Sequence, residues 1–359
     1  MGTISLCMIV RDEEDVLARC LNSASGLVDE ILIVDTGSTD RTKEIAKSFT
    51  DKVYDFTWID DFAAARNYAF SHAGCEYCMW LDADDVMAQA DREKFPALKE
   101  SLDGGVDVVM MPYYTGFDSQ GRVTFSYYRE RIVKNGAGMV WKGRVHEVIE
   151  TRGNVLYSDC GVTHSKLRPS DPDRNLRIFE KMLEQEEAID PRQQYYYGRE
   201  LYYHGRYREA LDVLGEFLED GRGWLENSIE ACRQCAYCWY ALDCEDKALQ
   251  ALFSSFAYDV PRAETCCDIG RHFFDRQLWD RAAYWYSRAL ECERGDGRGG
   301  FVQPEAYGFL PCIQLCVCYS RLGREEEARA YNERAAGFKP DSPAVAYNRA
   351  YFESLNKQS

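Results

Sequence analysis

The stretch M-W-L-D-A-D-D, residues 79–85, decides the fold of the first half of this chain. An apolar run ends there in three carboxylates, two of which frame a single alanine. Successive side chains of a strand alternate between its faces, so Asp82 and Asp84 are expected on the same side as the strand ends. Two such carboxylates repel each other unless a cation lies between them, and hard ions such as Mg²⁺ and Mn²⁺ prefer oxygen ligands. The stretch also fits a strand followed by a helix with acidic capping residues, and alone it leaves both interpretations open.

Apolar runs of strand length alternate with helical patterns through this half of the chain. The runs cover residues 4–10, 30–34, 52–56 and 78–81, and another follows at 106–112. Strands that alternate with helices predict an open, mainly parallel α/β sheet. Ligands of such sheets bind beyond the carboxyl ends of the strands. Polar residues that follow those ends are Arg11, Glu13, Asp35, Asp82 and Asp84.

The character of the sequence changes at the Pro- and Asp-rich stretch 169–172, and the pattern beyond it is helical throughout. Small residues recur there at intervals near the ~34-residue period of tetratricopeptide repeats, in which they let two antiparallel helices approach closely. They are Ala210, Ala248, Ala282 and Ala328. We therefore expect an α/β domain over residues 1–168, a linker and connecting helix over 169–190, and a tetratricopeptide-like helical solenoid over 191–359.

Four motifs in the first half carry a resemblance to a known family. They are S-L-C-M-I-V-R-D-E-E (5–14), I-L-I-V-D-T-G-S-T-D-R-T (31–42), F-A-A-A-R-N (62–67) and W-L-D-A-D-D (80–85). In this order the set resembles the family 2 glycosyltransferases, and more narrowly the bacterial branch that joins such a domain to tetratricopeptide repeats. The resemblance implies the GT-A fold, with helices on both faces of the sheet, and transfer of a sugar from a nucleotide donor with inversion at the anomeric carbon.

The resemblance also implies roles in holding the donor. Ile9, Arg11, Glu13 and Asp35 match the positions that hold the nucleotide base and ribose, whose N–H and hydroxyl groups a carboxylate can accept. Asp35 also fits a turn-forming residue before Gly37. Arg66 matches a helix residue that faces the donor, where a guanidinium pairs with phosphate, although a surface salt bridge is the alternative.

Metal and acceptor roles follow from the same resemblance. Asp82 and Asp84 match the D-x-D pair, in which Asp84 touches the metal and Asp82 contacts the ribose or a metal-bound water. His164, at the end of the last strand, is a candidate third ligand for Mg²⁺ or Mn²⁺, with a structural histidine as the alternative. The piece W-x-G-x-V-H-E (141–147) resembles the acceptor side.

An inverting transfer needs a base for the acceptor proton. Glu147 is the first candidate and Asp85 the second, and His146 is expected to orient the base or contact the diphosphate. The alternative for His146 and Glu147 is a plain strand in which one of the two residues faces outward.

Composition limits the other possibilities. The net charge of -17 argues against a nucleic-acid partner and against an anionic membrane surface. No apolar run approaches the ~18 residues of a membrane helix, and the N-terminus lacks the basic region of a signal peptide. Fifteen cysteines, among them Cys232, Cys235 and Cys238, raise the question of zinc. Because those three lie in a helical pattern, we expect core packing in a reducing, cytoplasmic location.

The sequence thus predicts a metal-dependent, inverting glycosyltransferase. Its donor is expected to be a UDP-sugar, and its acceptor a peptide or protein recruited by the repeats. The alternatives are a non-catalytic scaffold that binds nucleotide and peptide, and a transferase acting on glycans or small molecules. The sequence does not identify the sugar, the acceptor atom or the oligomeric state, and a homo-oligomer is among the alternatives.

Overall fold

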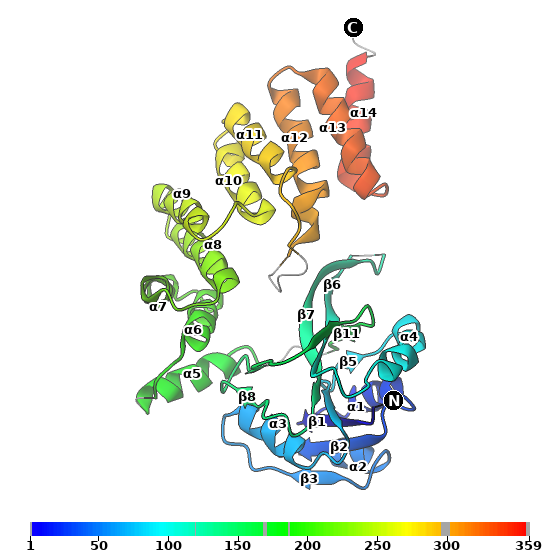
Figure 1. Cartoon of the computed structure of the whole chain (residues 1–359). Helices are drawn as coiled ribbons and strands as arrows, with labels where there is room; N and C mark the ends of the chain where they lie inside the picture. Colours follow the sequence, from blue (N-terminus) through cyan, green and yellow to red (C-terminus); the bar gives the residue numbers. More distant parts are fainter. Residues whose placement is uncertain (1, 119, 168–170, 186, 296–301, 357–359) are drawn as a thin grey trace. The chain divides into compact units, whose positions relative to one another are not determined.

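The computed structural model describes residues 2–118, 120–167, 171–185, 187–295 and 302–356 (Figure 1). The chain divides into two compact units, Met1–Ile189 and Asp190–Ser359. Residues 169 and 170 of the predicted break lie outside the described part. Hydrophobic clusters fill each unit separately, so each has a core of its own.

The first unit is built on strands that match the apolar runs of the sequence. In chain order they are β1 (Ile4–Val10), β2 (Glu30–Asp35), β3 (Val53–Asp55), β4 (Tyr77–Trp80), β5 (Asp85–Val86), β6 (Val108–Phe117), β7 (Val123–Lys134), β8 (Trp141–Lys142), β9 (Val148–Ile149), β10 (Val155–Tyr157) and β11 (Val162–His164). Nine of those within the described ranges form one sheet in the order β3-β2-β1-β4-β7-β6-β11-β5, with β10 paired to β6. β8 and β9 form a separate ribbon.

The central strands explain the continuous apolar run at residues 4–10. β1 lies between β2 and β4 and pairs in parallel with both, so nearly all of its side chains are buried. The prediction of a mainly parallel sheet is confirmed, with antiparallel pairing at two places, one of them between β11 and the short edge strand β5. β7 pairs antiparallel with both β4 and β6, because β6 and β7 form a hairpin inserted beside β4.

Helices cover both faces of this sheet, as predicted (Figure 1). They are α1 (Leu17–Ala24), α2 (Thr42–Lys47), α3 (Phe62–Ser71) and α4 (Gln89–Glu100), whereas α5 (Arg174–Glu184) contacts the start of α3. The apolar sides of α1, α2 and α4 share one hydrophobic cluster with β1 and β4, whereas α3 packs in the cluster on the other face. Asp61 caps α3 by accepting the Ala64 N–H at 2.8 Å, which fixes where that helix begins.

Helix α5 belongs to the first unit. Lys181 pairs with Asp60 at 2.5 Å, and the Arg174 guanidinium lies 4.7 Å from the centroid of the Phe62 ring. Arg144 and Glu187 form a further ion pair just beyond the helix. The connecting segment therefore extends the α/β unit to about Ile189.

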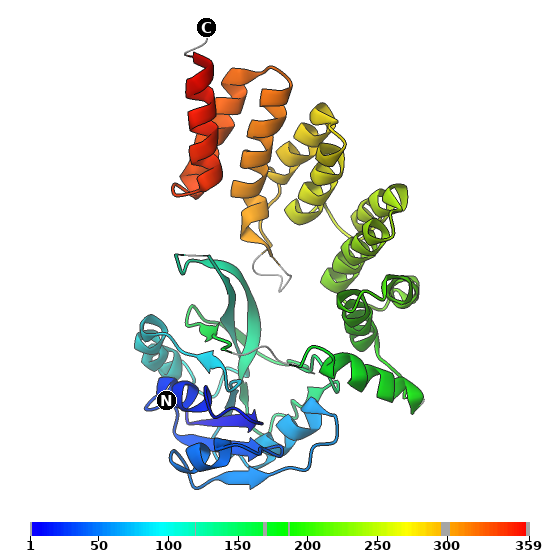
Figure 2. The same ribbon diagram turned by 180° about the vertical axis from the view of Figure 1, so that it is seen from behind.

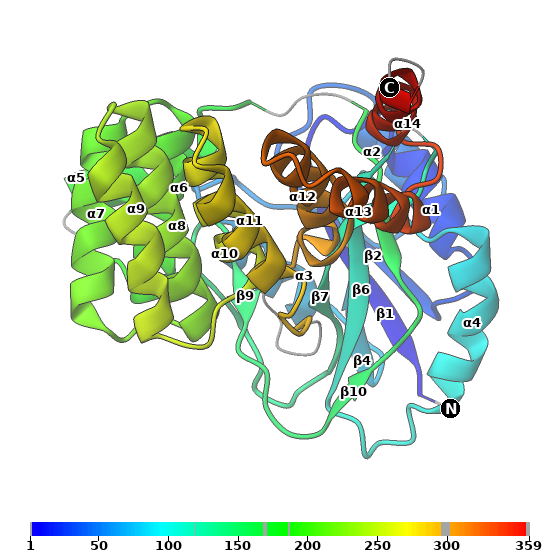
Figure 3. The same cartoon turned by 90° about the horizontal axis from the view of Figure 1, so that it is seen from above.

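The second unit is a row of antiparallel helix pairs, seen along the chain in Figure 1, from behind in Figure 2 and from above in Figure 3. Its helices are α6 (Pro191–Tyr203), α7 (Tyr207–Asp220), α8 (Leu225–Ala241), α9 (Glu245–Ser254), α10 (Ala263–Asp275), α11 (Trp279–Ala289), α12 (Phe309–Arg321), α13 (Glu325–Phe338) and α14 (Pro343–Asn356), with short 3₁₀ turns η1 (Ser255–Ala257) and η3 (Pro304–Tyr307). The small residues lie where the helices meet: Ala210, Ala248, Ala282 and Ala328 are all fully buried. A Cβ on Gly198 would come within 2.6 Å of Leu214, so α6 and α7 approach too closely there for any larger residue.

No helix in the described ranges has both the length and the apolar character needed to cross a bilayer.

Candidate functional site

The predicted site residues of the first unit converge on the edge of the sheet where β1, β2 and β4 end. Asp35 ends β2 and lies in register with Val10 of β1. Asp82 and Asp84 follow β4, and His164 ends β11 opposite Asp85 of β5. This is the edge at which a parallel sheet binds its ligands.

Asp35 offers an unsatisfied acceptor at this edge. Its side chain is 2% exposed, and Oδ1 accepts the N–H groups of Gly37 and Ser38, each at 3.0 Å. Gly37 has φ +106, a conformation that favours glycine, so the turn predicted for this residue is present. Oδ2, however, is buried without a hydrogen-bond partner. Buried carboxylate oxygens are normally satisfied, so this atom is suited to an N–H or O–H of a ligand.

The candidate donor-binding residues in and just after β1 are Ile9, Arg11 and Glu13. The Glu13 N–H donates to Thr42 Oγ1 at 2.7 Å, and the Glu13 carbonyl accepts the N–H groups that begin α1. Ile9 packs against the hydrophobic cluster that contains α3. The Arg11 side chain is 53% exposed.

Arg66 joins the D-x-D segment to the acceptor-side segment. Its Nη2 donates to Asp82 Oδ1 at 2.7 Å and its Nε to Glu147 Oε1 at 2.6 Å. The guanidinium lies 4.8 Å from the centroid of the Trp80 ring and 4.8 Å from that of the Trp141 ring, which pack edge to face. Its Nη1 is buried without a partner. Arg66 is therefore held in place and keeps one donor for an anionic group.

Asn67, the residue after Arg66 in α3, holds the segment 141–147 against this helix. The sequence did not reveal this role. Asn67 Nδ2 donates to the Trp141 carbonyl at 3.0 Å, and Asn67 Oδ1 accepts the Trp141 N–H at 2.9 Å. The Phe62 N–H also donates to the Arg144 carbonyl. Together these bonds bring the segment 141–147 against the helix that carries Arg66.

Within that segment, Glu147 is mostly buried, with a side chain 12% exposed and paired to Arg66. His146 adopts φ +51, a left-handed conformation that is uncommon for residues other than glycine. The tight turn connects β8 to β9 and brings Glu147 next to Arg66.

The D-x-D segment differs from the expectation of a continued strand. After β4 the chain turns, and the Asp85 N–H donates to the Asp82 carbonyl at 3.0 Å. Strand alternation does not apply across a turn, so it no longer places Asp82 and Asp84 on one face. The Asp82 side chain contacts Arg66, whereas Asp84 contacts His164. The same-face prediction is therefore wrong.

Asp82 is ionised through its cationic neighbours. Burial alone would raise the pKa of this carboxyl, but Arg66 and Arg131 together lower the pKa of Asp82 to about 2. It can therefore accept hydrogen bonds from a ligand throughout the physiological range.

Asp84, Asp85 and His164 bring oxygen and nitrogen atoms within 4.8 Å of one another. His164 Nδ1 is 3.4 Å from Asp84 Oδ1 and 3.5 Å from Asp85 Oδ1. The Asp84 carboxylate and the His164 imidazole are suitable ligands for Mn²⁺ or Mg²⁺, and Asp85 lies fully buried beside them. Asp84 and His164 keep side-chain exposures of 21% and 30%, so both remain accessible. The donor set fits the divalent ion that the family resemblance implies.

Asp85 is not placed to act as a base. Its side chain is 0% exposed, and Oδ2 pairs with Arg131 at 3.0 Å and accepts the Asp82 N–H at 3.0 Å. Oδ1 accepts the Tyr113 hydroxyl at 2.8 Å. A carboxylate that is buried and has both oxygens occupied cannot reach an acceptor proton. These contacts therefore contradict Asp85 as the second candidate for the base.

The sequence did not identify Arg131 and Tyr113 as parts of this edge. A signal was present, since R-E-R at 129–131 interrupts an otherwise apolar and aromatic strand pattern. Arg131 is fully buried and Glu130 is nearly so, and the backbone carbonyl of Glu130 accepts the Trp80 indole N–H at 2.6 Å. Buried charges in a strand indicate a partner elsewhere in the fold.

The His164 site predicts a pH dependence. Hydrogen bonds to Asp84 and Asp85 raise the pKa of His164 to about 10 in the metal-free chain. A raised pKa means that the protonated ring stabilises the metal-free fold at low pH, and that this contribution is lost as the pH rises toward 10. A metal must displace a proton, so Mn²⁺ affinity is expected to rise about tenfold per pH unit between pH 7 and 9. Calorimetry in buffers of different ionisation enthalpy measures both the affinity and the released proton. A flat affinity over this range contradicts His164 as a ligand.

The cysteines do not form a comparable cluster. All fifteen are free thiols, and Cys232, Cys235 and Cys238 lie buried within α8. Among the described residues, the group of histidines, cysteines and carboxylates close enough to hold a metal is Asp84, Asp85 and His164.

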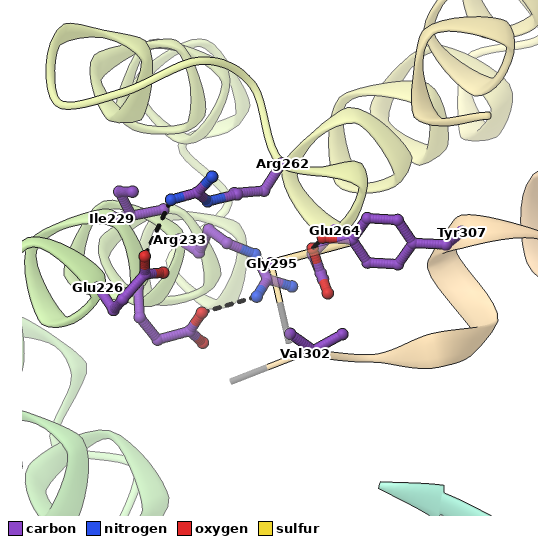
Figure 4. Close-up of a pocket in the computed structure, with 9 residues that line it drawn as sticks. Glu226, Ile229, Arg233, Arg262, Glu264, Gly295, Val302 and Tyr307 are labelled. Atoms are coloured by element: carbon purple, nitrogen blue, oxygen red, sulfur yellow. Dashed lines mark hydrogen bonds and ion pairs between the residues drawn. The ribbon is translucent and has the colours of Figure 1, made fainter. Parts of the chain in front are cut away.

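The helical unit carries a charged pocket lined by residues of α8, of α10 and of the segment before α12 (Figure 4). Its charges are largely paired internally. Arg233 donates to Glu230 and Asp268, and Arg262 donates to Glu226. Glu264 accepts the Gln303 N–H and the Tyr307 hydroxyl, which fixes the segment against α10. Among the described residues that line the pocket, the charged groups thus bond to other groups of the same unit, in contrast to the accessible Asp84–His164 pair.

Comparisons with known proteins agree with the first unit's architecture. Residues 5–157 match the family model described as Glycosyl transferase family 2. The glycosyltransferase SunS of Bacillus subtilis is 30% identical over 234 residues, covering 61% of this chain and 54% of that protein. A TPR repeat-containing protein of Synechococcus elongatus is 35% identical over 150 residues, covering 42% of this chain and 36% of that protein. The chain thus spans about a third to a half of the length of these relatives.

Among solved structures, S. aureus TarS residues 1–349 in complex with UDP aligns with 14% identity and a TM-score of 0.41, covering 72% of this chain and 93% of that one.

Proposed function

We propose that this chain, which joins a family 2 glycosyltransferase domain to tetratricopeptide-like helices, transfers a sugar from a UDP-sugar to a polypeptide acceptor with the help of Mg²⁺ or Mn²⁺. The observation that carries the proposal is the convergence at one sheet edge of three unsatisfied or open groups. They are the Asp35 oxygen, the free Arg66 donor and the Asp84–His164 pair. A nucleoside diphosphate with its metal ion requires an acceptor for the nucleoside, a donor for a phosphate and ligands for the ion.

The donor would be held along this edge by residues of the three strand ends. Asp35 Oδ2 would accept N–H or O–H groups of the nucleoside, and Arg66 Nη1 would pair with a phosphate oxygen. Asp84 and His164 would hold the divalent ion, with Asp82 close by for the ribose or a metal-bound water. The ion, when bound, neutralises the charge that develops on the departing diphosphate.

The transfer step would be a single displacement. The acceptor nucleophile forms a bond to the anomeric carbon while the bond from that carbon to the phosphate oxygen breaks, and UDP leaves. The acceptor proton passes to the Glu147 carboxylate. Glu147 is paired with Arg66, so the same arginine would contact the base and the donor phosphate. A proton acceptor and a leaving group are then fixed relative to each other by one side chain.

The helical unit is the proposed site of the acceptor polypeptide. Helix α6 presents Arg199 against the rings of Tyr195, Tyr196 and Tyr203, with centroids 5.2 to 5.7 Å from the guanidinium. Tyr203 is 62% exposed. An exposed tyrosine on a rigid, aromatic-rich helix provides contact area at low entropy cost. A cytoplasmic location is part of the proposal, since the free cysteines suit a reducing compartment.

The proposal is tested by incubating the full chain with a panel of nucleotide sugars, Mn²⁺ and candidate acceptor polypeptides, followed by intact-mass measurement. A mass increase equal to one sugar residue on the acceptor supports it. UDP release with no acceptor modified, across peptides, glycans and small molecules, would contradict the polypeptide acceptor. No UDP release with any donor would favour a nucleotide-binding scaffold.

Donor binding and proton transfer are expected to separate in two variants. Asp35→Ala removes a buried charged acceptor, so UDP affinity should fall about 10- to 100-fold. Glu147→Gln keeps a hydrogen-bond acceptor for Arg66 but cannot take a proton, so it should bind UDP within about twofold of wild type and lose transfer. Isothermal calorimetry with UDP and Mn²⁺ measures the first effect, and sugar transfer the second. Equal loss of UDP affinity in both variants would contradict this division of roles.

The two units are expected to be separable. A chain ending at Ile189 retains the sheet, its covering helices and the ion pairs of α5. It should therefore fold, bind UDP with near-wild-type affinity and hydrolyse the donor slowly. If the repeats hold the acceptor, its transfer to a polypeptide should fall at least about tenfold more than its hydrolysis. Transfer at the full-length rate would show that the first unit alone recognises the acceptor.

A further inference from the structure

Helix α1 holds both ends of the loop 82–87, which carries the accessible carboxylate of the proposed metal site. The Cys20 thiol donates to the Asp82 carbonyl at 3.4 Å, and the Ser23 hydroxyl accepts the Met87 N–H at 3.1 Å. The side chains of Cys20 and Ser23 are both buried, so water competes little for these bonds. The backbone of this loop is therefore fixed relative to α1.

The same helix also holds the end of β11, through Arg19. Arg19 Nη2 donates to the Ser165 carbonyl. The Ser165 N–H donates to the Asp84 carbonyl at 2.9 Å, which extends the antiparallel pairing of His164 with Asp85 by one residue. Ser165 is thus bonded to the loop through its N–H and to α1 through its carbonyl. Because Asp84 and His164 lie next to these bonds, the separation of their side chains depends on where Ser165 is held.

The environment of Arg19 indicates a role other than general stability. Its Nε is buried without a hydrogen-bond partner, and an unsatisfied buried donor is destabilising. Within the described ranges no carboxylate forms an ion pair with this guanidinium, which donates to the neutral Ser165 carbonyl. A charged group in such surroundings adds little to the stability of the fold, and the effect that remains is to fix the backbone beside His164.

We propose that Arg19 is a positioning residue for the divalent ion, which sets the separation of Asp84 and His164 by holding Ser165 against α1. This inference rests on the proposed function, because it concerns the same ion. Groups that support metal ligands fix the orientation of those ligands, and their loss typically lowers metal affinity about 10- to 100-fold. Helix α1 also begins at the Glu13 carbonyl, so one rigid element supports both the proposed nucleoside side and the metal side of the site.

Arg19→Met tests the proposal, because it keeps an apolar stem at a partly buried position and removes the donor. We expect the affinity for Mn²⁺, measured with saturating UDP from the loss of the free-ion electron paramagnetic resonance signal, to fall about tenfold or more. The sign of the change is informative, since removing a nearby positive charge without moving the ligands would raise the affinity for a cation.

Two further variants serve as controls for Arg19→Met. Arg19→Lys keeps a charge and a donor for the single bond to Ser165, so it should recover most of the Mn²⁺ affinity. Lys134→Met also removes a cation that donates to a backbone carbonyl, that of Gly104 at 2.6 Å, at a site without contact to α1. It should change the Mn²⁺ affinity by less than about twofold.

Amide hydrogen exchange of the metal-free chain tests the structural step without the ion. Arg19→Met should speed exchange of the Ser165 amide about tenfold or more and leave the amides of β1 and β4 unchanged, whereas a misfolded unit would expose those strands too. Unchanged Ser165 exchange, or an Mn²⁺ affinity equal to or above that of the wild type, overturns the role of Arg19. Absence of Mn²⁺ binding by the wild type itself overturns the metal-dependent function and this inference with it, so the two failures are distinguishable.

Discussion

Asp84→Asn is expected to lower metal-dependent turnover of a UDP-sugar by about a thousandfold or more. Asp84 is the accessible carboxylate of the Asp84–Asp85–His164 cluster, and Asp85 is committed to Arg131 and Tyr113. Loss of its charge removes the anionic ligand that holds the ion. Lewis-acid stabilisation by such an ion contributes several kcal/mol, and each 1.4 kcal/mol is a factor of ten in rate.

The measurement is UDP release with Mn²⁺ and with excess chelator, for wild type and variant. Asp159→Asn is a matched control, because that side chain is 86% exposed and carries the same charge. It should retain full activity. The fold of Asp84→Asn should remain intact, since the lost carboxylate lies at an accessible edge. Near-normal turnover by this variant in excess chelator would show that the site needs no metal.

Asp85→Asn is expected to have the largest effect on stability, a loss of about 3 to 5 kcal/mol in the free energy of unfolding of the first unit. Asp85 and Arg131 are both 0% exposed, and Arg131 Nε and Nη2 already lack partners. Removing the carboxylate charge leaves a buried guanidinium without its paired carboxylate, and Asp82 remains as the nearby negative charge. The double variant Asp85→Leu with Arg131→Met removes both charges and should recover at least half of the loss.

A chain of two units does not unfold in one step, so the stability of the first unit must be measured locally. Amide hydrogen exchange of β4 and β7 reports the free energy of opening the strands that carry the pair. A loss below about 1 kcal/mol in Asp85→Asn would show that the guanidinium finds another partner or stays hydrated. No recovery in the double variant would show that packing, rather than charge, dominates.

Some features of the site could be predicted because they depend on local pattern. A continuous apolar run such as residues 4–10 indicates a strand buried on both faces, and parallel strands place their carboxyl ends at one edge. The polar residues that follow those runs, such as Asp35 and Asp84, were therefore expected to meet. The division into an α/β part and a helical part followed from the loss of the strand pattern near residue 169.

Other features could not be predicted because they depend on contacts between distant segments. The hydrophobic pattern of β7 does not reveal its direction, and its insertion beside β4 brings Arg131 next to Asp85. The turn at Ala83–Asp84 separates Asp82 from Asp84, whereas a continued strand would have aligned them. The pairing of Arg66 with Glu147 joins residues 81 positions apart. The roles of Tyr113 and Asn67 follow only from these tertiary contacts.

The central claim is that nucleotide and metal bind together at the edge formed by Asp35, Asp84 and His164. A crystal structure of the full chain with UDP and Mn²⁺, recorded for the anomalous scattering of manganese, tests it most directly. The expected result is a manganese peak between the Asp84 carboxylate and His164, with the nucleoside against Asp35 and a phosphate oxygen at Arg66. Manganese or UDP bound elsewhere, with these four residues unoccupied, would contradict the account.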